Sequence, residues 1–243
     1  MLLLVFLIGL AAGFVDSTVG SGGLISIPGL IFLGLPPQVA IATDRLGSAG
    51  QTAAALLTFW KAKKIRWNYV IPFTFLAIIG SYLGARLLIT IDPKMLEKII
   101  GLMLVVVLPF LFLKKSLGTT RKKTNIVQKI IGFVNYFFIM IYNGFFGTGS
   151  GPFAIFNTMY FFGFTVIESN ATGIIPWFAL SILSLVVFAQ SGIIDWQKGI
   201  IFLAGMAAGG WLGARVAVTK GDVWVKRLFV VVVILSGIKL LVA

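Results

Sequence analysis

The stretch Gly13–Pro28 reads Gly-Phe-Val-Asp-Ser-Thr-Val-Gly-Ser-Gly-Gly-Leu-Ile-Ser-Ile-Pro, a glycine-rich break that carries one carboxylate inside a long apolar segment. A second break lies at Asn143–Gly151 and reads Asn-Gly-Phe-Phe-Gly-Thr-Gly-Ser-Gly. In lipid, the backbone leaves the helix only where it is buried in protein or lines a cavity, because unpaired N–H and C=O groups are too costly there. Two interrupted apolar segments in matching positions are typical of a transporter's binding site. We therefore expect the rest of the chain to be organised around these two breaks.

The composition indicates an all-α integral membrane protein with a single membrane domain over residues 1–243. The 243 residues are 59% hydrophobic and 11% charged, and the mean hydropathy is +1.05. Apolar runs of about 18 residues or more, long enough to span a bilayer, recur from end to end. The N-terminus has no basic region and no small-residue cleavage site before Asp16, so a cleaved signal peptide is not expected. The chain is predicted to be a multi-pass protein of a cell membrane, with the bacterial inner membrane as the expected location.

The charged and reactive residues exclude several classes of function. The formal net charge is +13, but the basic residues sit in short loops between apolar segments, where positive-inside bias explains them without nucleic acid. Cysteine and histidine are both absent, which excludes disulfides and thiolate metal sites and removes the commonest general base. Nothing resembles a nucleotide-binding loop. We expect no enzyme, no metal, no cofactor and no ATP drive within this chain.

The chain divides into two halves joined by a basic linker. The first half covers residues 1–113, the linker 114–125 is predicted to be cytoplasmic, and the second half covers 126–243. Each half is expected to contain one broken element followed by three transmembrane helices. The broken elements are predicted at 2–33 and 127–162, and the helices at 38–60, 67–90, 96–113, 167–190, 196–219 and 223–242.

The two halves are related by an ungapped offset of 129 residues. This offset aligns Gly20-Ser21-Gly22 with Gly149-Ser150-Gly151, and 19 of the 71 positions from 20 to 90 are identical to their partners. Apolar bias inflates such counts, but an ungapped register that also aligns Trp67 with Trp196 and Arg86 with Arg215 indicates a duplication.

The positions of the basic loops favour an inverted repeat over a parallel one. In the first half the basic loop lies between Trp60 and Trp67, whereas its partner in the second half, near Ile193–Lys198, is nearly neutral. The second half instead carries its basic residues at 219–227. Because basic loops face the cytoplasm, the switch fits an inverted repeat in which each broken element is a re-entrant or kinked hairpin. A parallel repeat with four crossings per half is the alternative.

Several motifs together resemble the sulfite exporter TauE/SafE family of membrane permeases, and the resemblance covers most of the chain. They are the glycine-rich opening Gly13–Gly23, its weaker repeat at Gly144–Gly151, the run Ala42-Thr43-Asp44-Arg45-Leu46 and the Gly80–Ala85 motif. The resemblance implies a permease for small anions, with sulfite, sulfonates and other organosulfur or carboxylated anions as candidates. Asp44-Arg45 stands where the family usually has Asn-Lys, so the substrate and the coupling ion do not carry over directly.

The glycine breaks are the first candidate for binding the substrate. A helix that restarts near Leu24 presents free N–H groups and the positive end of its dipole, which is an anion site without a basic side chain. Ser21 and Ser150 could cap these helices or donate to a ligand. The competing interpretation is tight helix packing through small residues. The candidate substrate-binding residues in and beside the breaks are Gly20, Ser21, Gly22, Gly23, Asn143, Gly149, Ser150 and Gly151.

Polar residues on the next helix of each half complete the candidate site. Thr43 and its repeat partner Thr172 suit oxyanion ligation but equally suit hydrogen bonding to their own helix. Arg45 aligns with Ile174, so it is a candidate for a single, asymmetric anion contact through its forked donors. An interfacial arginine that extends to the headgroups is the alternative.

Four charged residues are candidates for coupling or gating, and they are Asp16, Asp44, Arg86 and Arg215. Asp16 is an intramembrane carboxylate, which is expected to face a cavity and bind a proton or cation, or else to cap a helix inside the hairpin. Arg86 and Arg215 end paired helices and guard opposite mouths in an inverted arrangement, although an interfacial role explains them as well. The glycine pairs at 80/84 and 209/213 are expected to pack helices. Four tryptophans are expected in interfacial belts, Trp60, Trp67, Trp177 and Trp196.

The sequence therefore predicts a secondary transporter that moves a small anion by alternating access, with the two broken hairpins meeting near the middle of the membrane. The expected partners are a small anionic substrate, the lipid bilayer and a proton or cation as co-substrate. Two alternatives stay open at this point: a permease for a different solute such as a cation, and a non-transporting assembly subunit. An intramembrane enzyme would need a nucleophile–base pair or a metal cluster, and the chain contains neither cysteine nor histidine.

Overall fold

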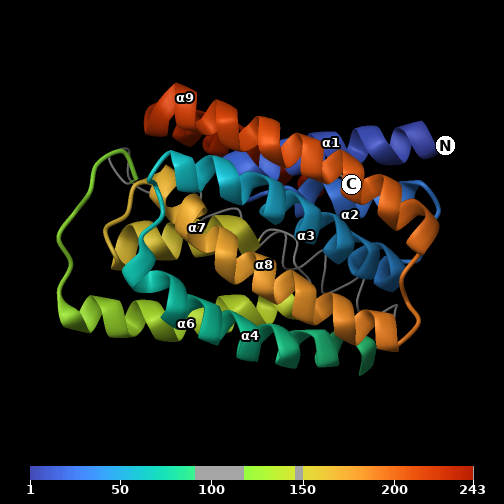
Figure 1. Ribbon diagram of the computed structural model, residues 1–243, viewed down its shortest axis with the longest axis horizontal. Coiled ribbons are helices and arrows are strands. Elements are labelled where there is room, and N and C mark those ends of the chain that lie inside the picture. The colour runs from blue at the N-terminus through green and yellow to red at the C-terminus, as the bar shows by residue number, and fades with distance from the viewer. Residues whose placement is uncertain (91–117, 146–149, 243) are drawn as a thin grey trace.

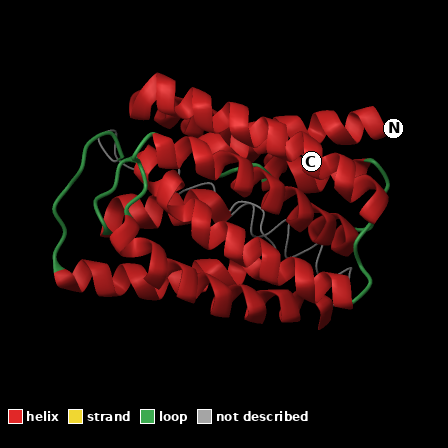
Figure 2. Cartoon of the chain, in the orientation of Figure 1, coloured by secondary structure: helices red, strands yellow, loops and turns green. Residues whose placement is uncertain are grey.

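The computed structural model describes residues 1–90, 118–145 and 150–242, and every regular element in these ranges is a helix (Figure 1, Figure 2). The helix predicted at 96–113, the start of the linker at 114–117 and Gly149 lie outside the described residues. The described helices are α1 (Leu2–Val19), α2 (Gly23–Phe32), α3 (Pro37–Lys61), α4 (Trp67–Thr90), α6 (Ile126–Phe145), α7 (Ser150–Phe161), α8 (Val166–Gln190) and α9 (Trp196–Val242).

Hydropathy and length confirm an all-helical membrane protein. Within the described ranges, five helical segments are long and apolar enough to cross a bilayer, and they are 2–19, 67–90, 126–145, 166–190 and 196–228. Helix α3 has 25 residues, about 37 Å at 1.5 Å per residue, which is also a spanning length. Its mean hydropathy is lowered by buried polar side chains, Asp44 and Arg45 among them. A polar helix of this length in a membrane protein is expected to face the protein interior.

The first glycine break separates α1 from α2 at the predicted place. Gly20 ends α1 in the left-handed conformation (φ 68°, ψ 26°), and its N–H donates to the carbonyl oxygen of Asp16 over 2.7 Å. The N–H of Gly22 donates to the carboxylate of Asp16 over 2.9 Å. A residue with a side chain is strained at such a positive φ, so glycine is required at position 20. The break is thus stabilised from within by one carboxylate and one glycine.

The first arm of each hairpin packs on the other half of the molecule through glycines. Gly80 and Gly84 of α4 face the backbone of α6, and a Cβ on Gly84 would overlap the carbonyl oxygen of Ile141. Their repeat partners Gly209 and Gly213 of α9 face α1 in the same way. The expected packing role of these glycine pairs is confirmed. Each pair therefore joins one half of the chain to the hairpin of the other half.

The packed pairs α1/α9 and α4/α6 run in the same direction within each pair. In α1, residue numbers rise from Gly9 to Phe14 as the contacted residues of α9 rise from Phe202 to Gly213. Helix α3 also runs parallel to the first part of α9, because Thr43 lies beside Gly199 and Gln51 lies beside Gly210. Short loops at 62–66 and 191–195 reverse the chain between α3 and α4 and between α8 and α9 (Figure 1). Helix α8 consequently runs opposite to α3, its partner in the repeat.

The repeat is visible in equivalent loops and core residues. Gly34 and Gly163 both have positive φ, and so do Lys63 and Gly192, which the same offset aligns. Phe59 and its partner Phe188 are fully buried, as are Phe73 and Phe202. The aligned arginines also behave alike: Arg86 lies over the ring of Tyr82 at 5.3 Å and Arg215 over the ring of Trp211 at 5.5 Å. Both arginines are exposed.

The last two predicted helices are separate, although both carry the label α9, because the backbone leaves the helix at Gly221 between them. Helix α9 contains Gly221 at φ 80° and ψ 172°, between the predicted helices 196–219 and 223–242. Asp222 beside this kink accepts a hydrogen bond of 2.9 Å from the N–H of Ile167, at the start of α8. The basic segment 219–227 therefore lies at the same end of the bundle as the start of α8.

We expect Gly84→Ala to destabilise the protein, because the added methyl group meets a backbone carbonyl of α6 that cannot rotate away. Overpacking of this kind typically costs about 1–3 kcal/mol. Gly213→Ala should have a similar effect on the α1/α9 contact. Leu83→Ala is the matched control, because the side chain of Leu83 is exposed at the neighbouring position. Thermal unfolding of the purified protein in detergent measures the difference, and equal midpoints for Gly84→Ala and Leu83→Ala would contradict the packing role.

Candidate functional site

One small cavity lies where the two glycine breaks meet, halfway along α3 and α8. Its volume is about 40 Å³, enough for a few water molecules or one small polyatomic ion. Both hairpins and both long central helices contribute to its wall. The lining residues are Asp16, Gly20, Gly23, Asp44, Arg45, Ser48, Thr52, Asn143, Ser150, Gly151, Trp177, Leu180 and Ser181.

The backbones of the two breaks touch at this cavity. A Cβ on Gly151 would overlap the carbonyl oxygen of Gly20, so the contact requires glycine at position 151. Helix α2 begins at Gly23 and helix α7 begins at Ser150, and both residues line the cavity. Two helix N-termini, each with the positive end of its dipole, consequently face one small space.

Arg45 enters the cavity from α3 and is anchored on the opposite half. The side chain is only 4% exposed, which excludes the alternative of an arginine that extends to the headgroups. Its Nη1 donates to the side-chain oxygen of Asn143 over 3.1 Å, and its Nη2 donates to the backbone carbonyl of the same residue, at the end of α6. The Nε group is buried without a hydrogen-bond partner in the described parts of the chain. Arg45 therefore has a buried donor left over for a ligand.

Two carboxylates share the cavity with Arg45. Asp16 accepts the N–H of Gly22, so it both supports the hairpin and lines the cavity. Asp44 accepts a hydrogen bond from Ser48 over 3.4 Å through one oxygen, while its other oxygen is buried without a partner among the described residues. Neither carboxylate forms an ion pair with Arg45 within residues 1–90, 118–145 and 150–242. The cavity thus holds one cation and two potential anions.

Trp177 lines the cavity, so its predicted place in an interfacial belt is wrong. It was expected in an interfacial belt, but it lies in the middle of α8, is 7% exposed, and its Nε1–H is buried without a partner in the described ranges. Trp60, Trp67 and Trp196, in contrast, are about half exposed near helix ends. The length of α8 hides this difference in the sequence, because hydropathy alone does not say which face of an apolar helix is buried.

Four further lining residues were missed, Ser48, Thr52, Leu180 and Ser181. Two patterns in the sequence indicate that Ser48, Thr52 and Ser181 face the cavity. Asp44, Ser48 and Thr52 follow each other at intervals of four, which places them on one face of α3. The 129-residue offset then carries position 48 to Trp177 and position 52 to Ser181, on the matching face of α8.

The remaining candidate residues lie beside or away from the cavity. Ser21 and Gly22 are buried in the break but do not line it. Thr43 accepts a 3.2 Å hydrogen bond from the N–H of Asp195, and Thr172 accepts a 3.0 Å hydrogen bond from the N–H of Arg66. The 129-residue offset aligns Thr43 with Thr172 and Arg66 with Asp195, so the two hydrogen bonds are equivalent in the repeat. These bonds tie the two halves together at opposite ends of α3 and α8, outside the cavity.

The donors and acceptors in the cavity suit a small anion accompanied by a proton or cation. Arg45 Nε, Trp177 Nε1 and the two helix N-termini offer positive potential, while Asp16 and Asp44 can accept a proton or contact a cation. In the described part of the chain, no three His, Cys, Asp or Glu side chains gather as a metal site would require.

Proteins named as probable membrane transporters are similar in sequence to nearly the full length of this chain. Residues 5–240 match the family described as "Sulfite exporter TauE/SafE". A "Probable membrane transporter protein" of Haemophilus influenzae is 31% identical over 232 residues, which cover 95% of this chain and 91% of that protein. "Probable membrane transporter protein ORF9" of a Sinorhizobium species is 27% identical, with coverage of 99% and 92%. "Probable membrane transporter protein YfcA" of Escherichia coli K12 is 26% identical, with coverage of 97% and 88%. No solved structure matches the chain.

Proposed function

The chain belongs to the sulfite exporter TauE/SafE family of multi-pass membrane transporters, and from this premise we propose that it is a secondary transporter for a small oxyanion such as sulfite or an organosulfonate. The observation that carries the proposal is the cavity at the meeting point of the two breaks. It offers a buried arginine donor, a buried indole donor and two helix N-termini within about 40 Å³. A pyramidal or tetrahedral anion with three oxygens has the size and the acceptors to use them.

We further propose that the two halves form an inverted repeat of one membrane domain, with the linker 114–125 in the cytoplasm. The opposite directions of α3 and α8 support this arrangement, as does the parallel packing of α1 on α9 and of α4 on α6. The charges support it too. The basic segments 61–66, 118–123 and 219–227 lie at one end of the bundle, because Arg66 and Arg121 both contact Glu168 at the start of α8, where Asp222 is also bound. A shared basic end is expected to face the cytoplasm.

Alternating access then has a structural basis in the two cross-half hydrogen bonds. The Thr172–Arg66 bond lies at the basic end, and the Thr43–Asp195 bond lies at the opposite end. In an inverted repeat, opening one side requires breaking one of these bonds while its partner is kept. Arg86 and Arg215 are proposed to attract anions toward the two mouths, because both are exposed and are related by the repeat.

The charge balance of the cavity supports co-transport with a proton or a cation. With Asp16 and Asp44 ionised and Arg45 charged, the side chains around the cavity carry a net charge of −1 before any substrate enters. Two like charges in one buried cavity repel each other more strongly than they would in water, because the effective dielectric constant is lower there. Protonation of one carboxylate, or binding of a cation beside it, removes this penalty. The same carboxylates favour a cation as the transported solute, which is the second candidate function.

The test of the anion site is uptake of labelled sulfite into proteoliposomes. We expect Arg45→Gln to lower uptake at least tenfold, because an interaction with a buried charged donor is typically worth about 1.5–3 kcal/mol. Trp177→Phe keeps an aromatic side chain but removes the N–H together with the five-membered ring, so we expect a smaller loss that appears mainly as weaker binding. Lys220→Gln is the control, because this lysine is exposed far from the cavity. Undiminished sulfite uptake by Arg45→Gln, or uptake of a cation without any anion, would contradict the proposal.

The charge balance also predicts that anion binding strengthens as pH falls. If one proton is taken up with each anion, the affinity should rise by up to about tenfold per pH unit over the range where the carboxylate titrates. The ligand should be a sulfonate, whose own charge stays fixed across this range, and calorimetric titration of the purified protein measures the affinity. At least one of Asp16→Asn and Asp44→Asn should flatten the dependence, while Asp195→Asn, in a loop outside the cavity, should keep it. An unchanged slope in both cavity variants would assign the coupling to other groups.

A further inference from the structure

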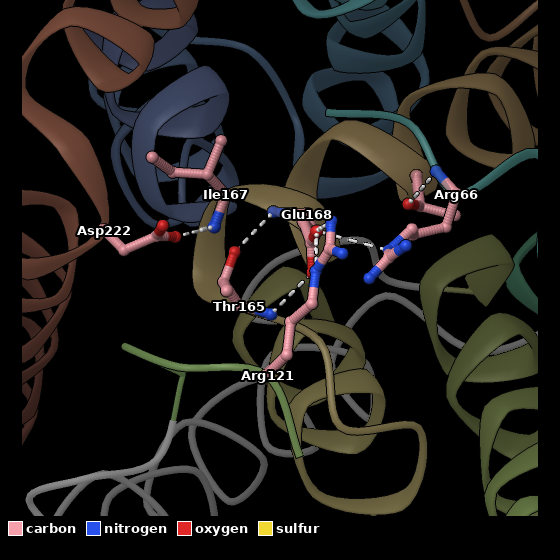
Figure 3. Close-up of polar contacts among 7 residues, drawn as sticks. Arg66, Arg121, Thr165, Ile167, Glu168 and Asp222 are labelled. Carbon is pink, nitrogen blue, oxygen red and sulfur yellow. Dashed lines mark hydrogen bonds and ion pairs between the residues drawn. The ribbon is translucent and has the colours of Figure 1, made fainter. Parts of the chain in front are cut away.

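A second charged site lies at the basic end of the bundle, away from the central cavity. Glu168 is only 3% exposed, and its carboxylate contacts two arginines from distant segments (Figure 3). Arg66 approaches from the loop between α3 and α4, with its Nε 3.2 Å from Oε1 of Glu168. Arg121 approaches from the linker and donates its Nε–H to the same oxygen over 2.7 Å. One buried negative charge therefore holds two positive charges in place.

Further hydrogen bonds surround this ion-pair cluster. Thr165 and Glu168 form a reciprocal cap at the start of α8, with hydrogen bonds of 3.1 and 3.3 Å between each side chain and the other residue's N–H (Figure 3). The linker is bound to the same region, because the N–H of Lys122 donates to the carbonyl oxygen of Gly163 over 3.0 Å. A Cβ on Gly163 would overlap the carbonyl of Lys122, so the two segments lie in close contact.

The two arginines form part of the wall of an open pocket of about 660 Å³. Its polar lining is strongly basic, and Glu168, which is nearly inaccessible, is not among the lining residues. The wall contains four basic side chains, and the nearby Glu168 carboxylate balances only one of these charges. The pocket therefore has an excess of positive charge. The lining residues are Ile65, Arg66, Trp67, Asn68, Tyr69, Arg121, Lys122, Lys123, Phe162, Gly163 and Phe164.

The pocket adjoins the surface of the protein that faces the lipid tails. Trp67, in its wall, is 52% exposed and packs edge-to-face on the half-exposed Trp60, with ring centroids 6.1 Å apart. Exposed tryptophans of this kind mark the level of the headgroups. Helix α4 continues from Trp67 with exposed apolar side chains, Ile71 at 80% and Phe75 at 63%. The basic pocket therefore lies at the depth where lipid phosphates are found, directly above an apolar surface for acyl chains.

We propose that this pocket binds the phosphate of an anionic membrane phospholipid, with Arg121, Lys122 and Lys123 as its contacts and Arg66 held ready beside them by Glu168. Basic pockets between transmembrane helices on the cytoplasmic side bind anionic lipid head groups, and the topology proposed above places this end of the bundle in the cytoplasm. A free phosphate ion could contact the same basic side chains, but it has no acyl chains to pack against the adjoining tryptophans and the exposed apolar residues of α4. The bound lipid joins the linker to the α3–α4 loop and so stabilises the contact between the halves. The proposal does not depend on the identity of the transported substrate.

The test is thermal unfolding of the delipidated protein in a neutral detergent, with added phosphatidylglycerol, phosphatidylcholine or inorganic phosphate. Phosphatidylglycerol at about 100 times its Kd should raise the midpoint by roughly 5–10 °C, because it binds only the folded state. Phosphatidylcholine and inorganic phosphate should each produce a clearly smaller shift. The phosphatidylglycerol shift should also shrink as salt is added, as expected for a partly exposed charged contact.

The decisive variant is Lys122→Gln combined with Lys123→Gln, which removes two pocket charges and leaves both contacts of Glu168 intact. We expect it to fold with a normal midpoint in detergent and to lose at least half of the phosphatidylglycerol shift. Lys64→Gln combined with Lys220→Gln removes the same charge near the same end without touching the pocket wall, so it should keep the full shift. The proposal is overturned if the first double variant keeps the full shift, if phosphatidylcholine stabilises equally, or if inorganic phosphate alone reproduces the effect.

Discussion

The structure depends on satisfying the polar backbone where two helices are interrupted inside the membrane. Unpaired N–H and C=O groups are costly there, so each break needs donors and acceptors from its surroundings. The first break takes an acceptor from its own Asp16, and Asn170 of α8 donates to the carbonyl oxygen of Ser17 over 2.7 Å. At the end of α6, the donor to the backbone carbonyl of Asn143 is Arg45 from α3. Each hairpin is therefore completed by a side chain of the opposite half. The cavity lies where the two breaks meet, beside the side chains that each half donates to the break of the other.

The two halves share a backbone framework around the site, and the residues that differ between the halves determine the chemistry of the cavity. The glycine contacts, the buried phenylalanines and the loop conformations agree between the halves, so the scaffold is close to symmetric. The residues that line the cavity, in contrast, mostly differ between the aligned positions of the two halves. Asp44 and Arg45 align with Gly173 and Ile174, and Ser48 aligns with Trp177. Both charged groups of this set consequently come from α3, while α8 contributes an indole. In the function that we propose, the symmetric frame permits two equivalent open states, and the asymmetric lining binds a single anion and its counter-charge in one orientation.

Much of the fold was predictable because its signals are local or repeated. Gly20 and Gly221 interrupt helices where they were expected to, and the offset of 129 residues holds through the loops. Within the candidate site, the sequence could identify Asp16 and Arg45, since charge is rare in an apolar helix. It could not identify Trp177, because the burial of one face of α8 depends on its packing against other helices. Glu168 was overlooked for another reason. Its Thr165-x-x-Glu168 capping pattern is readable in the sequence, but the two arginines that it holds come from segments more than 40 residues away.

We propose that an anion binds where Gly20 meets Gly151. Anomalous diffraction from crystals soaked in selenite, a heavier chemical analogue of sulfite, tests this most directly. We expect one strong selenium peak inside the cavity, within hydrogen-bonding distance of Arg45, and no such peak in crystals of Arg45→Gln treated identically. A peak at the basic pocket or a helix end instead, with the cavity empty at saturating selenite, would rule out anion binding in the cavity.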